Sequence, residues 1–273
     1  MRRAFGMIAL YAMVVAGAMF AMIPLAWMVS ASFMPTGQAS DLPVRWLPDH
    51  PTFEHYVALF RRLSLARNLL NSVVIALGAT AMSVILNAMA GYAFAKLRFR
   101  GRERIFRFLL VSLVIPAQVG MLPLFILLRE MGLVNTYVGA MIPFLASVFG
   151  IFLVRQYVSG VPDALLQAAR IDGAGEWRVF WTMVLPVIRP VLVTFGTFTL
   201  LGSWNDFLWP LIVLTNSDMY TLPVALANLV GEHVQDTELM MAGSVLTVLP
   251  VVVLFVALQH YYIEGIMSGG VKE

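Results

Sequence analysis

Six long apolar runs dominate the sequence, and they constrain its fold more than any other feature. They cover about 7–30, 70–95, 105–128, 137–154, 191–213 and 239–260. A helix of about this length crosses the ~30 Å hydrocarbon core of a bilayer. Lipid offers the backbone no hydrogen-bond partners, so we expect each run to form a helix that satisfies its own backbone groups. The sequence therefore predicts an all-α membrane protein, with six transmembrane helices in a single domain over 1–273.

The composition agrees with a membrane protein. Only 12% of the residues are charged, whereas soluble domains have about 25%. The chain has no cysteine, which excludes disulfides, thiolate metal sites and a cysteine nucleophile. The first apolar run is longer than the ~7–15 residues of a cleavable signal peptide, so we expect a retained spanning helix there.

The basic residues predict the orientation of the helices. With the N-terminus inside, 13 of the 18 Lys and Arg residues fall on the inner side, six of them in the turn 96–107. Inner loops of membrane proteins carry the excess of Lys and Arg. Both termini and the segment 161–190 are therefore predicted to be cytoplasmic. Because the basic residues gather at the ends of the runs, the formal net charge of +3 does not indicate nucleic-acid binding.

The segment 161–190 lies between two runs but carries its own helical signals. Residues 164–171 favour a helix. Gly173 and Gly175 then interrupt it, because glycine readily adopts positive φ. A second helix is predicted from apolar residues at i, i+3, i+4 and i+7 between Trp177 and Val184. The segment is thus expected to form a helix, a glycine turn and a second helix.

No catalytic or cofactor-binding pattern is present in the sequence. There is no G-x-x-x-x-G-K-[ST] motif for holding a nucleotide phosphate. The four histidines are dispersed, so no metal site is expected. We expect no catalytic residues, no metal and no cofactor in this chain. Any energy from ATP must then come through another polypeptide.

The segment 161–190 resembles the cytoplasmic signature loop of bacterial ABC-importer permeases. That pattern is Glu-Ala-Ala, three residues, Gly, nine residues, an apolar residue, one residue and Leu-Pro. The matching residues are Gln167, Ala168, Ala169, Gly173, Met183, Leu185 and Pro186. Gln167 departs from the pattern, because the family usually has Glu there. A neutral amide forms a weaker contact with a charged partner than a carboxylate does.

Further motifs resemble the second (maltose-type) permease subunit of carbohydrate importers. They are Asn71-Ser72, the sequence GYAFA at 91–95, Trp204-Asn205-Asp206-Phe207, and Gly269-Gly270-Val271-Lys272. The resemblance implies a subunit of the bacterial inner membrane, embedded in lipid, that forms half of a sugar pathway. It also implies three kinds of partner: a homologous second permease, two copies of an ATPase that binds ATP and Mg²⁺, and an extracytoplasmic sugar-binding protein.

The resemblance also implies which residues meet the ATPase: Gln167, Ala168, Ala169, Asp172, Gly173, Ala174 and Phe180. The small residues would allow close backbone approach, and Phe180 would offer an apolar anchor. The alternative is an interfacial helix resting on lipid headgroups. A helix of that kind has no need of the glycine break.

Polar residues inside spans usually face a cavity or another helix. On this basis the candidates for the substrate path are Gln118, Trp204, Asn205 and Trp209. Amides would bond sugar hydroxyls, and an indole would stack on a sugar face. The alternative is that residues 204–206 hold helices together or cap a break. We assign Asp206 to structure and Asn87 to a helix–helix contact.

Three other functions are weighed against a sugar permease. A secondary transporter would favour an inverted repeat or several intramembrane carboxylates, and a membrane enzyme would need a cluster of catalytic groups. An ABC permease for a glycerol phosphate ester would favour basic residues along the path. The spans have almost none, which favours a neutral sugar or oligosaccharide.

Overall fold

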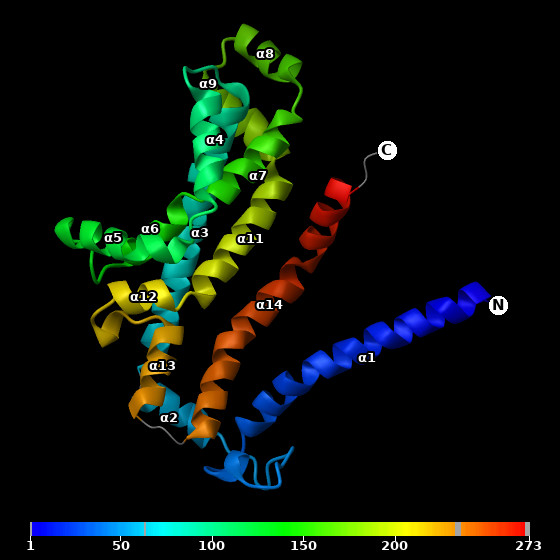
Figure 1. The fold of residues 1–273 in the computed structure, drawn as a ribbon, viewed down its shortest axis with the longest axis vertical. Helices are drawn as coiled ribbons and strands as arrows, with labels where there is room; N and C mark the ends of the chain where they lie inside the picture. The colour runs from blue at the N-terminus through cyan, green and yellow to red at the C-terminus, as the bar shows by residue number, and fades with distance from the viewer. Residues whose placement is uncertain (1, 63, 233–235, 271–273) are drawn as a thin grey trace. The chain divides into compact units, whose positions relative to one another are not determined.

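The computed structural model describes residues 2–62, 64–232 and 236–270, which form helices and connecting loops with no strand among them (Figure 1). The chain divides into two compact units. One comprises residues 1–66 and 225–253, and the other comprises residues 67–224 and 254–273.

The helices follow one another along the chain with few long connections. They are α1 (Arg2–Ala31), α2 (Glu54–Arg62), α3 (Leu65–Lys96), α4 (Arg102–Ser112), α5 (Ala117–Glu130), α6 (Tyr137–Leu145), α7 (Val148–Ser159), α8 (Asp163–Ile171), α9 (Glu176–Val179), a π-helical turn (Phe180–Val184), α10 (Leu185–Val187), α11 (Arg189–Asn205), α12 (Leu208–Val213), α13 (Leu222–Glu232) and α14 (Thr237–Gly270). The connections also contain the short 3₁₀ turns Gln38–Ser40 and Ser217–Met219.

Among the described residues, three continuous helices are long and apolar enough to cross a membrane: Gly6–Ala31, Leu65–Lys96 and Thr237–Ala257. The prediction of one helix per run is wrong for the other three runs. The run 105–128 is divided between α4 and α5, which meet at 106°, and the run 137–154 between α6 and α7, at 48°. The run 191–213 is divided between α11 and α12, and α11 meets the helical stretch 176–187 at 81°. If each bent pair is one span, the total reaches six.

Identifiable residues cause two of these breaks. Pro116 precedes α5, and a residue before proline is disfavoured in helical conformation. At the α6–α7 break, the Ser147 side chain caps α7 by accepting from the Gly150 N–H. Asn87 of α3 donates to the Leu145 carbonyl (3.1 Å) and accepts from the Ser147 N–H (2.9 Å). Asn87 therefore makes the expected helix–helix contact and also satisfies the backbone groups that the break exposes.

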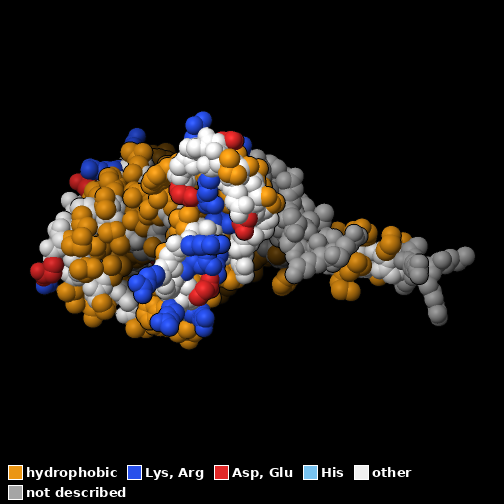
Figure 2. All heavy atoms as spheres, turned by 90° about the horizontal axis from the view of Figure 1, so that it is seen from above, with side chains coloured by type: hydrophobic (Ala, Val, Ile, Leu, Met, Phe, Trp, Pro, Cys, Tyr) orange, Lys and Arg blue, Asp and Glu red, His pale blue; other side chains and the backbone are white. Residues whose placement is uncertain are grey.

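The unit of residues 67–224 and 254–273 packs tightly around α3. A Cβ on Gly91 would lie 2.5 Å from the Val154 side chain, so the glycine lets α3 and α7 approach closely. At the end of α3 that carries Gly91, a buried apolar cluster joins α3, α7, α8 and the α9–α11 segment. Tyr92, Val158, Leu166 and Phe180 belong to it. Figure 2 looks onto the end of the molecule that bears α8 and α9 and shows Lys and Arg side chains gathered in a band.

At the other end of α3, Asn71 holds the connection that follows α12. Its side-chain amide donates to the carbonyls of Asp218 (2.9 Å) and Tyr220 (3.0 Å), and it accepts from the Tyr137 hydroxyl (2.7 Å). In the unit of residues 1–66 and 225–253, Glu238 at the start of α14 accepts from the Ala39 N–H (2.7 Å). That bond ties the segment after α1 to α14.

Candidate functional site

The segment 161–190 forms the expected helix, glycine turn and second helix. The turn is a Schellman motif: the Ala174 N–H donates to the Ala169 carbonyl and the Gly173 N–H donates to the Arg170 carbonyl, both over 3.0 Å. Gly173 has φ +82°, and a Cβ there would meet nothing within 4 Å. The left-handed backbone therefore requires a glycine here, as expected for the turn.

Helix α8 is amphipathic, which divides its residues between the body of the protein and the surface. Leu166 and Ala169, one turn apart, are buried in the apolar cluster. Gln167 and Ala168 are exposed. Ile171 is 85% exposed, an unusual position for so large an apolar side chain. The outward surface of α8 thus combines a neutral amide with small and apolar groups.

Lys96, the last residue of α3, binds the start of α8. Its Nζ donates to the Val161 carbonyl (2.7 Å) and to Asp163 Oδ1 (2.6 Å). The Lys96 hydrogen bond and charge lower the pKa of the Asp163 carboxyl below its usual value. This contact fixes the entry to α8 on the end of α3.

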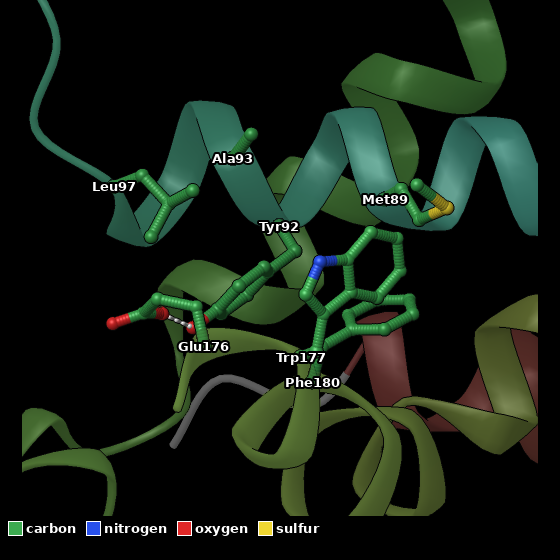
Figure 3. A pocket seen from close by; sticks show the side chains of 7 residues that line it. All are labelled: Met89, Tyr92, Ala93, Leu97, Glu176, Trp177 and Phe180. Carbon is green, nitrogen blue, oxygen red and sulfur yellow. Dashed lines mark hydrogen bonds between the residues drawn. The ribbon is translucent and has the colours of Figure 1, made fainter. Parts of the chain in front are cut away.

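A second contact joins α3 to the exit from α8. The Tyr92 hydroxyl donates to Glu176 Oε2 over 2.6 Å, and Arg170 Nε donates to Glu176 Oε1 over 2.8 Å. Figure 3 shows Tyr92 and Glu176 directed toward each other, in a pocket that Trp177 and Phe180 also line. The two contacts together attach both ends of α8 to one turn of α3. We call Tyr92, Lys96, Asp163, Arg170 and Glu176 the loop anchor.

The predicted docking residues do not all reach the surface. Gln167, Ala168, Asp172 and Gly173 are exposed and Ala174 is half-buried. Phe180 is 3% exposed, and its ring centroid lies 5.6 Å from that of Tyr92. In this structure Phe180 is an internal packing residue, contrary to the expected role as an anchor for a partner. Ile171 and Trp177, which is 65% exposed, are the most exposed large apolar side chains of the segment.

The candidates for the substrate path are placed differently from one another. Trp209 is 1% exposed, and its Nε1–H donates to the Gly139 carbonyl (3.0 Å), so the ring belongs to the core. Trp204 is also buried. Gln118 is exposed, as is Asn205, whose side chain bonds to the Leu201 carbonyl of its own helix. The two amides are exposed, whereas the two indoles are buried.

A cavity of about 440 Å³ lies between α5, α6 and the α11–α12 break. Of the four candidates, Trp209 lines it, whereas Ala117 and Asp206 line it in place of their sequence neighbours Gln118 and Asn205. Asp206 directly follows the last residue of α11 and lies at the break before α12.

Sequence reasoning did not find the loop anchor. Tyr92 falls in the GYAFA motif and Lys96 begins the basic turn, but neither pattern shows a partner 65 to 84 residues away. Arg170 and Glu176 lie six residues apart across the glycine turn. That opposite-charge pair was a local signal that could have been used.

The chain is similar to known transport proteins over nearly its whole length. It is 38% identical to the arabinooligosaccharides transport system permease protein AraQ of Halalkalibacterium halodurans, over 93% of this chain and 92% of that protein. It is 32% identical to the lactose transport system permease protein LacG of Rhizobium radiobacter, over 100% of this chain and 98% of that protein.

A solved structure supports the fold. A chain of a bacterial ABC transporter involved in the import of the acidic polysaccharide alginate superposes with a TM-score of 0.82, at 24% identity, over 95% of this chain and 97% of that one. Residues 83–267 match the model of one protein family. The chain therefore belongs to the family of binding-protein-dependent transport system inner membrane components.

Proposed function

We propose that this chain forms half of the membrane pathway for a sugar or oligosaccharide in a binding-protein-dependent ABC importer. The observation that carries the proposal is the end-to-end similarity to permeases named for arabinooligosaccharides and lactose. The other half of the pathway comes from a homologous second permease. The scarcity of basic residues in the spans fits a neutral solute better than a phosphate ester.

The segment 161–190 is proposed to receive the movement of the ATPase. In this proposal both termini and the segment are cytoplasmic, and two copies of an ATP-binding subunit, which carry ATP and Mg²⁺, serve the two permeases. The partner contacts Gln167, Ala168 and the turn at 172–174, with Ile171 and Trp177 as apolar contacts in place of Phe180. Their exposure supports this assignment.

The loop anchor supports a mechanical role for α8. A displacement of α8 must either carry the end of α3 with it or break the bonds made by Tyr92 and Lys96. Leu166 and Ala169 also pack into the cluster that includes the start of α11. A push on the exposed side of α8 is therefore transmitted to two helices at once, because packed interiors are stiff.

The solute contacts proposed for this chain are Gln118 and Asn205, whose amides are accessible. An extracytoplasmic sugar-binding protein would deliver the solute. A related alginate transporter has been solved in complex with a pentasaccharide-bound periplasmic protein, with a TM-score of 0.66 to this chain.

Reconstitution tests the proposed function. The chain is assembled in lipid with a candidate second permease, ATPase and binding protein from the same organism. Its binding-protein-dependent ATPase rate is then measured with a panel of neutral oligosaccharides and with glycerol phosphate esters. The proposal predicts stimulation by at least one oligosaccharide. Stimulation by an ester alone would overturn the assignment of the solute.

A further inference from the structure

The turn between α3 and α4 carries more positive charge than the protein neutralises. Residues 96–107 contain six Lys and Arg residues and a single acidic residue, Glu103. Arg155 donates to both carboxylate oxygens of Glu103 (2.8 and 3.1 Å), and Arg102 donates to it at 3.3 Å. Lys96 is bound to Asp163. The acidic partners near this turn are therefore already occupied.

Four arginines of the turn remain without an internal counter-charge. Within the described part of the chain, Arg98, Arg100, Arg104 and Arg107 form no ion pair, and all four are exposed. Arg104 and Arg107 line a cavity of about 590 Å³ together with Arg98, Phe99, Gly101, Arg102 and Glu103, whose carboxylate already accepts from Arg102 and Arg155. This cavity lies on the side of the molecule where Figure 2 shows basic side chains beside hydrophobic ones. Several guanidinium groups that line one cavity favour the binding of a phosphate group there.

The face of α4 that begins with these arginines continues as an apolar surface. Arg104, Arg107, Phe108 and Val111 share this face by their i, i+3, i+4 and i+7 spacing. Phe108 is 74% exposed and Val111 is 67% exposed. From Arg104 to Val111 the helix rises about 10 Å. Along this distance the surface changes from cationic to fully apolar.

A phospholipid presents this same order of groups, with a phosphate followed by acyl chains. We propose that the cavity at Arg104 and Arg107 binds the headgroup of an anionic phospholipid, whose acyl chain lies along Phe108 and Val111. Basic pockets between membrane helices are suited to such headgroups. A free phosphate would use the arginines but not the apolar face. The proposal rests on the membrane location of the chain and not on its solute or ATPase.

Lipid binding by the purified chain tests the proposal. The full chain in a mild detergent is given phosphatidylglycerol, phosphatidylcholine, inorganic phosphate or glycerol 3-phosphate. Retained lipid is counted by native mass spectrometry, and the unfolding temperature is measured. We expect phosphatidylglycerol alone to be retained and to raise the unfolding temperature. The same shift from inorganic phosphate or glycerol 3-phosphate would overturn the lipid assignment.

Matched variants locate the site. R104Q/R107Q should weaken retention of phosphatidylglycerol about tenfold, and R104K/R107K should keep most of it. R61Q/R129Q, which removes two exposed charges elsewhere, should leave it unchanged. Equal loss of phosphatidylglycerol in R61Q/R129Q would show that removing any two positive charges weakens lipid binding, and would contradict a specific site. Full retention by R104Q/R107Q, or loss of partner-chain assembly without any loss of lipid, would contradict the proposed site.

Discussion

The hydroxyl of Tyr92 donates a 2.6 Å hydrogen bond to Glu176, across 84 residues of sequence. Tyr92 belongs to a membrane-spanning helix, and Glu176 begins the second helix of the proposed docking loop. Arg170 binds the same carboxylate from the end of α8. This three-residue contact links the loop to a span, as the bonds from Lys96 to Val161 and Asp163 do one turn further along α3.

Tyr92→Phe removes the hydroxyl but keeps the ring that packs against Phe180. The variant should lose about 1 to 2 kcal/mol of stability, because Arg170 still holds Glu176. Solute transported per ATP hydrolysed should fall in reconstituted vesicles. The matched control is Tyr137→Phe, which removes a 2.7 Å bond to Asn71 at the opposite end of α3. Equal losses of coupling in the two variants would contradict a special role for the loop anchor.

Gly173→Ala places a Cβ at φ +82°. The variant should cost about 1 to 2 kcal/mol, because a side chain is strained in the left-handed region. Gly175→Ala is the control: its φ is −68° and a Cβ there also meets nothing within 4 Å. Thermal unfolding of the two purified variants measures their loss of stability relative to the wild type. If both substitutions have the same effect, the glycine is not required by backbone conformation.

The Lys96–Asp163 contact predicts a dependence of stability on pH. The folded-state pKa of Asp163 is lowered by Lys96. Its stabilising contribution is therefore complete above the unfolded-state pKa of about 4 and is lost as the pH falls through the folded-state pKa. The difference in unfolding temperature between wild type and Asp163→Asn should be present at pH 7 and should shrink below about pH 4. A difference that stays constant over this range would exclude the ion pair as its source.

Asn87→Ala should destabilise the chain strongly. Asn87 is buried and bonds to backbone groups on both sides of the α6–α7 break, and each buried group left unpaired costs about 1 to 3 kcal/mol. Asn205→Ala should be nearly neutral for stability, because Asn205 is exposed and bonds only to Leu201 of its own helix among the described contacts. Thermal unfolding in detergent measures both. Similar stability of the two variants would contradict the role given to Asn87.

The local features of the fold could be predicted from the sequence, and the long-range ones could not. Apolar length predicted where the membrane segments lie. Gly173 predicted the turn after α8, because glycine readily adopts the positive φ that ends a helix. The α6–α7 break was not predicted, since it depends on Asn87 reaching the backbone 58 to 60 residues away. Hydropathy measures only how apolar a run is, and a broken pair of helices is as apolar as a continuous one.

The same limit applies to the candidate site. The motif spacing predicted the docking segment but not which way each side chain points. Phe180 was expected at the surface because aromatic residues often anchor partners, yet it packs against Tyr92. Trp209 was expected on a solute path, and it lines the cavity at the α11–α12 break, but its ring is buried and its N–H donates to Gly139. In both cases a neighbour distant in sequence decides whether the side chain is buried.

The absence of cysteine makes a direct test of the docking loop practicable. Ala168→Cys places one thiol on the exposed side of α8, and Ser217→Cys places one in the exposed loop after α12. Maleimide labelling is compared for the assembled importer and for the same complex stripped of its ATPase. The account predicts that the ATPase protects the thiol at 168 and leaves the thiol at 217 unchanged. Equal labelling at 168 with and without the ATPase would contradict the claim that 161–190 is the docking loop.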